Sequence, residues 1–132
     1  EADILCLFGQ LGSGKTVLTK GIAAGLGVKE KVISPSFVLL RQYPGAKFSL
    51  NHFDLYRLSA ERDILTLGYE EYFYDDAITV IEWADRLKHL LPKEYLKVKI
   101  SIEGNSKRVF NFTGIGERYK KLARKINEDI SA

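Results

Sequence analysis

The chain is poor in cysteine and contains no long apolar run. Cys6 is its one cysteine, which excludes an internal disulfide, and a free thiol inside an apolar run usually behaves as a small buried hydrophobe. No segment approaches the roughly 20 apolar residues that cross a bilayer. The first residues, EADILCLFG, lack the basic flank and the cleavage pattern of a signal peptide. We therefore expect a soluble, cytoplasmic protein.

A large excess of one charge is also missing. The chain has 20 basic and 17 acidic residues, and its formal net charge of +3 is too small to indicate nucleic-acid binding by itself. Its 132 residues are 45% hydrophobic, enough to fill one core but not two. We expect residues 1–132 to form a single domain. The first residue is not methionine, so the presence of an upstream segment is left open.

The order of the sequence patterns predicts alternating strands and helices. The apolar run Ile4–Phe8 suits a strand buried on both faces, and a helix over Lys15–Leu26 follows it and stops at Gly27. Pro44 and Gly45 separate two β-rich segments, which predicts a hairpin. The other expected elements are hairpin strands over Phe37–Tyr43 and Lys47–Tyr56, a short helix over Ser59–Leu67, a strand over Ile78–Trp83, a helix over Ala84–Leu91, a strand with Leu96, Val98, Ile100 and Ile102 on its dry face, a strand over Lys107–Thr113, and a final helix with apolar residues from Tyr119 to Ile130.

The segment GQLGSGKT, Gly9–Thr16, has the GxxxxGK[ST] spacing of a phosphate-binding loop between a strand and a helix. Its glycines let backbone N–H groups turn toward phosphate oxygens, and the helix directs its positive end at the same place. Lys15 supplies a mobile charge for the β- and γ-phosphates, and the Thr16 hydroxyl suits a Mg²⁺ ion that shares them. We expect ATP or GTP to contact Gly12, Ser13, Gly14, Lys15, Thr16 and Val17.

These patterns together predict an α/β fold. We expect a three-layer domain like that of P-loop NTPases, with a mostly parallel central sheet and an antiparallel hairpin portion.

Two acidic residues are candidates for the chemistry beside the phosphates. Hydrolysis or phosphoryl transfer needs a carboxylate at a strand end to hold the metal and position the attacking group. Glu82 follows a buried strand, at the edge where open α/β sheets collect ligands. Asp54 lies in NHFDLYR and shares a strand face with His52. We expect Asp54 to belong to the metal site with Thr16 and Glu82, where it either holds magnesium-bound water or orients the nucleophile. From position alone, a salt bridge or a helix cap explains each acid equally well, but the phosphate loop favours Asp54, Glu82 and Lys15 as catalytic residues.

Three other polar features have competing explanations. His52 is a single strand histidine, and we expect it to be a hydrogen-bonded structural residue rather than a catalytic one. Arg108 lies near the EGNS turn, where its guanidinium either reaches a phosphate or faces solvent. The polar residues 34–36 form either a nucleotide-sensing segment or a plain connection.

In order along the chain, GQLGSGKT, SPSF, HFDLYRL, GYEEYF, IEWAD and LP resemble the TsaE family, the small ATPase of bacterial tRNA threonylcarbamoyladenosine biosynthesis. The similarity covers most of the chain, and HFDLYRL and IEW at these intervals are distinctive. It implies an ATPase in which Thr16 and Glu82 ligate Mg²⁺ and Asp54 is the acid needed for hydrolysis of ATP to ADP. It also implies that Ser36 lies in a switch-like loop and that Trp83 is near the working face.

The resemblance implies protein partners as well. These are TsaD-like and TsaB-like subunits. The first is a kinase-like subunit that transfers the threonylcarbamoyl group to the adenosine beside the anticodon, and the second is its inactive paralogue. Contact of this chain with tRNA would then be indirect. The family usually has threonine at the position of Ser36, and it begins with another strand and helix, for which this chain starts too late. Contact with tRNA or an acidic partner, or a merely solvated face, explains the basic residues of the last helix, which are Arg118, Lys120, Lys121, Arg124 and Lys125.

Two other functions use the same phosphate loop. A small-molecule kinase usually carries an arginine-rich lid, whereas the region between Asp54 and Ile78 is acidic and aromatic. A nucleotide sensor that docks onto a partner without hydrolysis would result if neither acid reached the metal. The ordered motifs favour ATP hydrolysis over both.

Overall fold

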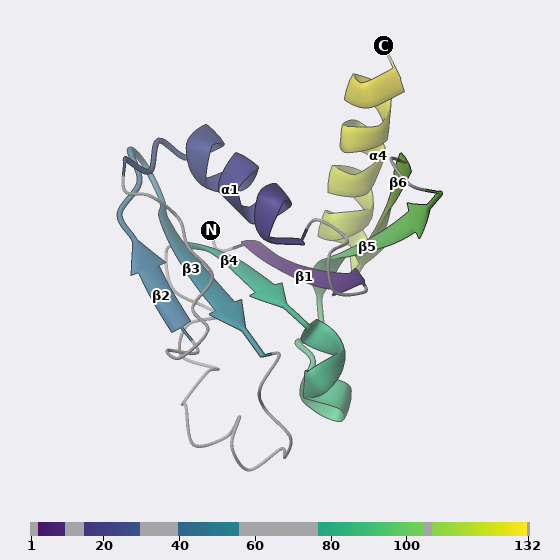
Figure 1. Ribbon diagram of the computed structural model, residues 1–132, viewed down its shortest axis with the longest axis horizontal. Helices are drawn as coiled ribbons and strands as arrows, with labels where there is room; N and C mark the ends of the chain where they lie inside the picture. The colour runs from purple at the N-terminus through teal and green to yellow at the C-terminus, as the bar shows by residue number, and fades with distance from the viewer. Residues whose placement is uncertain (1–2, 10–14, 30–39, 56–76, 105–106, 132) are drawn as a thin grey trace.

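The computed structural model describes residues 3–9, 15–29, 40–55, 77–104 and 107–131. In this part of the chain, six strands form one sheet in the order β2-β3-β4-β1-β5-β6 (Figure 1). The elements are β1 (Asp3–Gly9), α1 (Lys15–Gly25), β2 (Leu40–Tyr43), β3 (Ser49–Asp54), β4 (Ala77–Glu82), the 3₁₀ helix η1 (Ala84–Leu90), β5 (Tyr95–Glu103), β6 (Lys107–Ile115) and α4 (Glu117–Ser131).

The four central strands of the sheet are parallel. β1 pairs in parallel with both β4 and β5, and β3 pairs in parallel with β4. The edge strands β2 and β6 run antiparallel to β3 and β5, so the expected hairpin is confirmed and a second antiparallel pair closes the other edge. Because β1, β3, β4 and β5 are parallel, their carboxyl ends meet at one edge of the sheet.

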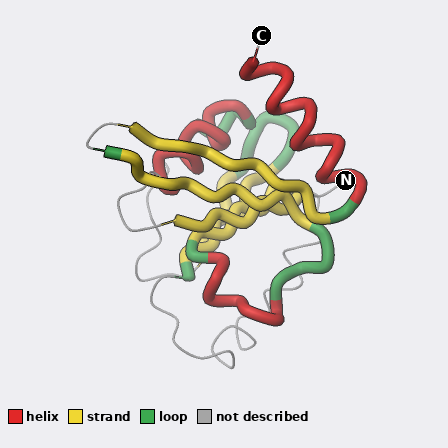
Figure 2. Tube along the Cα trace, turned by 90° about the vertical axis from the view of Figure 1, so that its right-hand side faces the viewer, coloured by secondary structure: helices red, strands yellow, loops and turns green. Residues whose placement is uncertain are grey.

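Helices lie on both sides of the sheet, which confirms the three-layer α/β fold. The α1 and α4 helices cover one face, and η1 lies against the other (Figure 2). Alternate strand residues point to opposite faces of the sheet, so the interior of the fold consists of two buried clusters, one on each face. The core under α1 and α4 contains Leu7, Leu50, Val80, Leu96 and Val98, all fully buried. Ile4, Cys6, Phe53, Ile81 and Leu87 belong to the core on the η1 side.

Cys6 belongs to the second core and is fully buried, as expected for a small apolar side chain. Burial raises the pKa of the Cys6 thiol well above its usual range, which keeps the thiol protonated and unreactive. No helix in the described ranges combines the length and the hydropathy that a membrane span requires.

The α1 helix ends where the sequence predicts. Gly27 has a φ of 77°, and the N–H groups of Gly27 and Val28 donate to the carbonyls of Ala24 and Ala23, which is a Schellman motif. Leu18, Ile22 and Leu26 of this segment are half-buried and pack against the core, and Thr19 and Ala23 beside them are buried. Small residues at the contact allow the helix to approach the sheet closely.

The expected helix after β4 is confirmed, and it is the 3₁₀ helix η1. One expectation needs correction. Ile102 was expected on the dry face of its strand, but it is 37% exposed. Its strand continues beyond Ile100, the last residue of β5 that pairs with β1, so Ile102 extends past the centre of the sheet. The predicted short helix over residues 59–67 lies outside the described residues.

A buried hydrogen bond attaches α4 to the central strand. The Ile4 backbone N–H donates to the Tyr119 hydroxyl over 3.0 Å, and the Tyr119 side chain is only 3% exposed. Tyr119→Phe would leave this N–H without its acceptor, so we expect the free energy of unfolding to fall by about 1–3 kcal/mol. Denaturant unfolding measures the change. Tyr95→Phe is the matched control, because the Tyr95 hydroxyl makes no hydrogen bond to the described residues. Equal losses in the two variants would contradict this role.

Candidate active site

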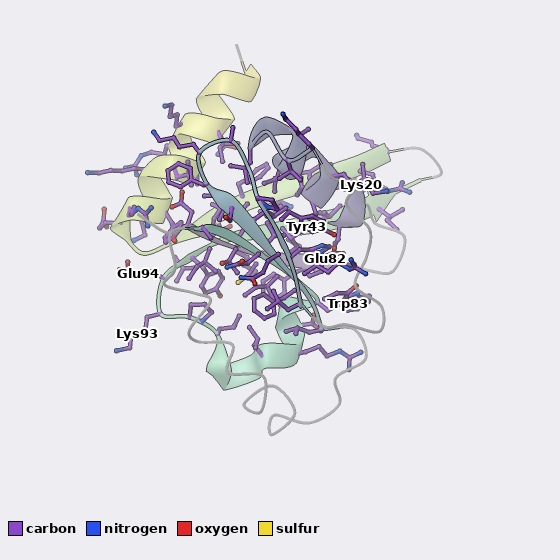
Figure 3. All side chains as sticks on the ribbon, turned by 90° about the vertical axis from the view of Figure 1, so that its left-hand side faces the viewer. Lys20, Tyr43, Glu82, Trp83, Lys93 and Glu94 are labelled. Carbon is purple, nitrogen blue, oxygen red and sulfur yellow. The ribbon has the colours of Figure 1, made fainter. Side chains whose placement is uncertain are left out.

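The candidate site lies at the edge of the sheet where the parallel strands end. In the register of the sheet, Glu82 on β4 stands between Leu7 on β1 and Asp54 on β3. Five residues separate Gly9, the last residue of β1, from Lys15, the first residue of helix α1. Figure 3 shows Glu82 and Trp83 at the opposite end of the molecule from Lys93 and Glu94, the residues that precede β5. Open α/β sheets commonly bind ligands at this carboxyl edge.

The Lys15 side chain is held inside the site. It is only 4% exposed, its ammonium donates to the Gly9 carbonyl over 2.7 Å, and the ammonium nitrogen lies 4.2 Å from the centre of the Trp83 ring. Burial lowers the pKa of Lys15, while the negative charges of Glu82 and Asp54 oppose that shift. The lysine therefore lies in the electrostatic field of both predicted acids, where added phosphate charge would favour its protonated form.

Glu82 is buried and forms a hydrogen bond with His52, the histidine for which the sequence predicts a structural role. The Nε2 atom of His52 lies 2.5 Å from Oε2 of Glu82, and both residues are at most 2% exposed. A buried carboxylate requires donors or cations to balance its lost hydration. His52 meets part of that requirement, in agreement with the expectation that it is a hydrogen-bonded residue.

Trp83 occupies a strained position directly after β4. Its φ is 59°, and it is the one non-glycine residue with positive φ among the described residues. Such a conformation costs about 1–3 kcal/mol and persists only when its surroundings impose it. The turn brings the indole ring over the Lys15 ammonium, and the Arg86 guanidinium carbon lies 5.9 Å from the same ring centre. The ring thereby contributes a π-face beside the phosphate-loop lysine.

The two predicted acids are direct neighbours in the register of the sheet. Asp54 and Glu82 stand opposite each other on adjacent parallel strands, whose backbones lie about 4.8 Å apart. Negative charges on neighbouring strand ends repel each other, and a bound cation would relieve that repulsion. Mg²⁺ usually binds through one or two carboxylates together with substrate phosphates. Within the described residues, no group of three or more His, Cys, Asp or Glu side chains could hold a metal ion.

The other predicted nucleotide contacts are distributed unevenly. Val17 is 72% exposed on the first turn of α1. Arg108 is exposed on β6 and pairs with Ile102, two strands away from β1, and its guanidinium donates to the Lys107 carbonyl. The structure does not bring Arg108 into contact with Lys15 or the acids. Gly12, Ser13, Gly14, the loop containing Ser36 and the side chain of Thr16 lie outside what is described.

Sequence patterns missed three contributions to this site. His52 was not connected with Glu82, which is 30 positions away, and no local signal links them. Asp85 was not considered, although its charge also opposes the lowered pKa of Lys15. Trp83 was placed near the site only through the family resemblance, and its left-handed backbone is invisible in a sequence pattern.

The fold and the arrangement of this edge define an α/β domain like that of P-loop NTPases. The family described as "Threonylcarbamoyl adenosine biosynthesis protein TsaE" matches residues 1–110. The chain belongs to this TsaE family.

Individual relatives agree with that assignment. The chain is 38% identical over 125 residues to the tRNA threonylcarbamoyladenosine biosynthesis protein TsaE of Bacillus subtilis, covering 95% of this chain and 78% of the relative. It is 37% identical over 107 residues to the protein of that name from Treponema pallidum, covering 80% and 78% of the two chains. The crystal structure of Bacillus subtilis YdiB superimposes with a TM-score of 0.81 at 35% identity, covering 97% of this chain and 78% of that one.

Proposed function

We propose that this protein is a Mg²⁺-dependent ATPase that supports the formation of threonylcarbamoyladenosine in tRNA. The observation that carries the proposal is the convergence of Lys15, Asp54 and Glu82 at one sheet edge, where both acids act on the charge of the lysine. Membership of the TsaE family supports the biological role. The loop at Gly9–Thr16 supplies the backbone for phosphate binding.

The residues of the site divide the work of hydrolysis. Lys15 binds the β- and γ-phosphates after exchanging the Gly9 carbonyl for phosphate oxygens. Glu82 and Thr16 would hold Mg²⁺, which neutralises charge on the β- and γ-phosphate oxygens when bound. Asp54, which is more exposed than Glu82, orients the attacking water or a water of the metal shell. Cleavage of the β–γ bond by this water yields ADP and inorganic phosphate.

Partners complete the proposed cycle. TsaD-like and TsaB-like subunits would carry the transfer reaction, and this protein would energise or reset their cycle. Phosphoryl transfer is often accelerated by an arginine supplied from a second protein. In the described residues, Arg108 lies away from Lys15, which is consistent with an ATPase that requires its partners for full turnover. Contact with tRNA would then be indirect.

Lys15→Ala tests the assignment of the phosphate site. Removal of the buried ammonium should weaken ATP binding by at least ~10-fold and abolish partner-stimulated phosphate release, because a charged hydrogen bond to phosphate is worth about 1.5–3 kcal/mol. Isothermal titration and phosphate release with TsaD-like and TsaB-like proteins measure the two effects. Lys20→Ala is the control, because it removes an exposed lysine from the same helix.

The outcomes separate the proposed ATPase from the alternatives. Unchanged binding and complex-dependent modification in Lys15→Ala would exclude the phosphate site. ATP binding by the wild type with no phosphate release, even with partners present, would indicate a nucleotide sensor. Phosphate that appears on a metabolite rather than free in solution would indicate a small-molecule kinase.

A further inference from the structure

We propose that His52 is a positioning residue that fixes the orientation of the Glu82 carboxylate toward the metal and phosphate side of the site. This inference rests on the proposed Mg²⁺ site. Its basis is the short contact between His52 Nε2 and Glu82 Oε2, which joins two side chains that are fully or almost fully buried. The hydrogen bond and the phosphate-loop lysine belong to the same small region, since the Glu82 charge acts on Lys15.

The two nitrogens of the His52 ring have different environments. Nε2 faces the Glu82 carboxylate, whereas Nδ1 is buried without a hydrogen-bond partner. A carboxylate only accepts hydrogen bonds, so Nε2 must donate to it. An imidazole that donates through Nε2 alone carries a lone pair on Nδ1. Burying that lone pair without a donor costs less free energy than burying an N–H without an acceptor. The structure thus assigns one donor direction to the ring.

This donor restricts the one soft torsion of the glutamate. The terminal torsion of a glutamate side chain is broad and roughly two-fold, so an isolated Glu carboxylate can rotate. A hydrogen bond from a rigid ring to Oε2 removes that freedom and sets the direction of the other oxygen. Both residues are on strands: His52 pairs with Val80, and Glu82 follows two residues later on the same face. The sheet therefore holds donor and acceptor in a constant relation.

A purely structural role for His52 would have different consequences. In that case the histidine only balances the buried charge of Glu82, and its replacement would lower stability without changing how the site responds to Mg²⁺. The positioning role predicts a specific loss in metal response, because residues that orient metal ligands typically contribute ~10–100-fold to metal affinity or activity. The Lys15 ammonium, which interacts with the Glu82 charge, is the cation that could compensate for part of the loss.

The test compares His52→Leu with His52→Gln. The Gln side-chain amide offers a donor near the position of Nε2, whereas Leu fills space without donating. The measured quantity is the ratio of ADP dissociation constants in EDTA and in saturating Mg²⁺, obtained by isothermal titration of the whole chain. His52→Leu should reduce by ~10-fold or more the factor by which Mg²⁺ strengthens ADP binding, and His52→Gln should restore most of that factor. Binding of ADP in EDTA should change little in either variant.

A double-mutant cycle identifies Glu82 as the intermediary. If His52 acts through Glu82, His52→Leu should have almost no further effect on the Mg²⁺ ratio in a Glu82→Ala background, which lacks the acceptor of the His52 N–H. Additive effects would overturn the proposal, as would a wild-type Mg²⁺ ratio in His52→Leu. Failure of His52→Gln to recover any response, with thermal unfolding as in wild type, would also overturn it.

Ring nitrogen spectroscopy gives a readout that needs no substitution at position 52. The chain has two histidines, so ¹H–¹⁵N ring correlations of the wild type and of His89→Gln assign the His52 signals. The proposal requires a proton on Nε2, and a proton on Nδ1 alone would overturn it. Phosphate release by the wild type is followed in parallel. Its absence would contradict the proposed hydrolysis, while the Mg²⁺ ratio would still decide the role of His52.

Discussion

Glu82→Gln is expected to lower the rate of ATP hydrolysis by ~100-fold or more, with Mg²⁺-free binding of ADP preserved or strengthened. The substitution keeps the shape of the side chain and an oxygen that can accept the His52 N–H, but it removes the buried negative charge. Loss of a charged group that acts at the transferred phosphate typically costs several kcal/mol of transition-state stabilisation. Without that charge, the phosphates also experience less repulsion in the absence of metal.

Phosphate release and paired titrations in Mg²⁺ and EDTA measure this prediction. Glu94→Gln is the matched control, because Glu94 is exposed and precedes β5 at the other end of the sheet (Figure 3). Asp54→Asn should also slow hydrolysis but weaken the Mg²⁺ response less than Glu82→Gln, since Asp54 is the more exposed of the two acids. Hydrolysis by Glu82→Gln at the wild-type rate would exclude Glu82 from the chemistry.

Gly114→Val is expected to cause the largest loss of stability. A Cβ at Gly114 would lie 2.2 Å from the Lys120 nitrogen and the Tyr119 carbonyl carbon, both backbone atoms of α4. Since backbone cannot rotate aside as a side chain can, α4 would have to move away from β6 and weaken the Tyr119 hydrogen bond to Ile4. Overpacking of this kind costs about 3 kcal/mol or more when the neighbours cannot adjust.

Denaturant unfolding of Gly114→Val and Gly114→Ala measures the effect, and loss of soluble folded protein is its extreme form. Gly21→Ala is the control, because a Cβ at Gly21 meets nothing within 4 Å and the residue lies inside helix α1. That substitution should stabilise the protein by about 0.5–1 kcal/mol. A Gly114→Val variant as stable as wild type would show that α4 does not press on β6 at this point.

Much of the fold follows from local sequence patterns. The apolar run of β1, the glycine after α1 and the alternation along β5 are each visible in a few consecutive residues, and the structure confirms all three elements. The error at Ile102 arises because a local pattern omits the neighbouring strands. The exposure of Ile102 depends on how far β1 extends beside β5.

For the candidate site too, some features could be predicted from local sequence patterns and others required the structure. The types and positions of Lys15, Asp54 and Glu82 were predicted from motif spacing and from strand ends, and their roles in catalysis stay predictions. Their arrangement required the structure. The same is true of the bond from His52 to Glu82 and of the Trp83 ring over Lys15.

The sequence by itself therefore determined the spacing of the predicted phosphate loop, the strand and the helix on either side of it, and the positions of the two acids, because each depends on a pattern within one short segment. Only the tertiary structure decided that β3 and β4 are parallel neighbours and that their ends meet the start of α1. The physical reason is that strand pairing joins residues far apart in the chain and is settled by the packing of whole sheet faces against α1, α4 and η1. That pairing places His52 and Asp54 beside Glu82.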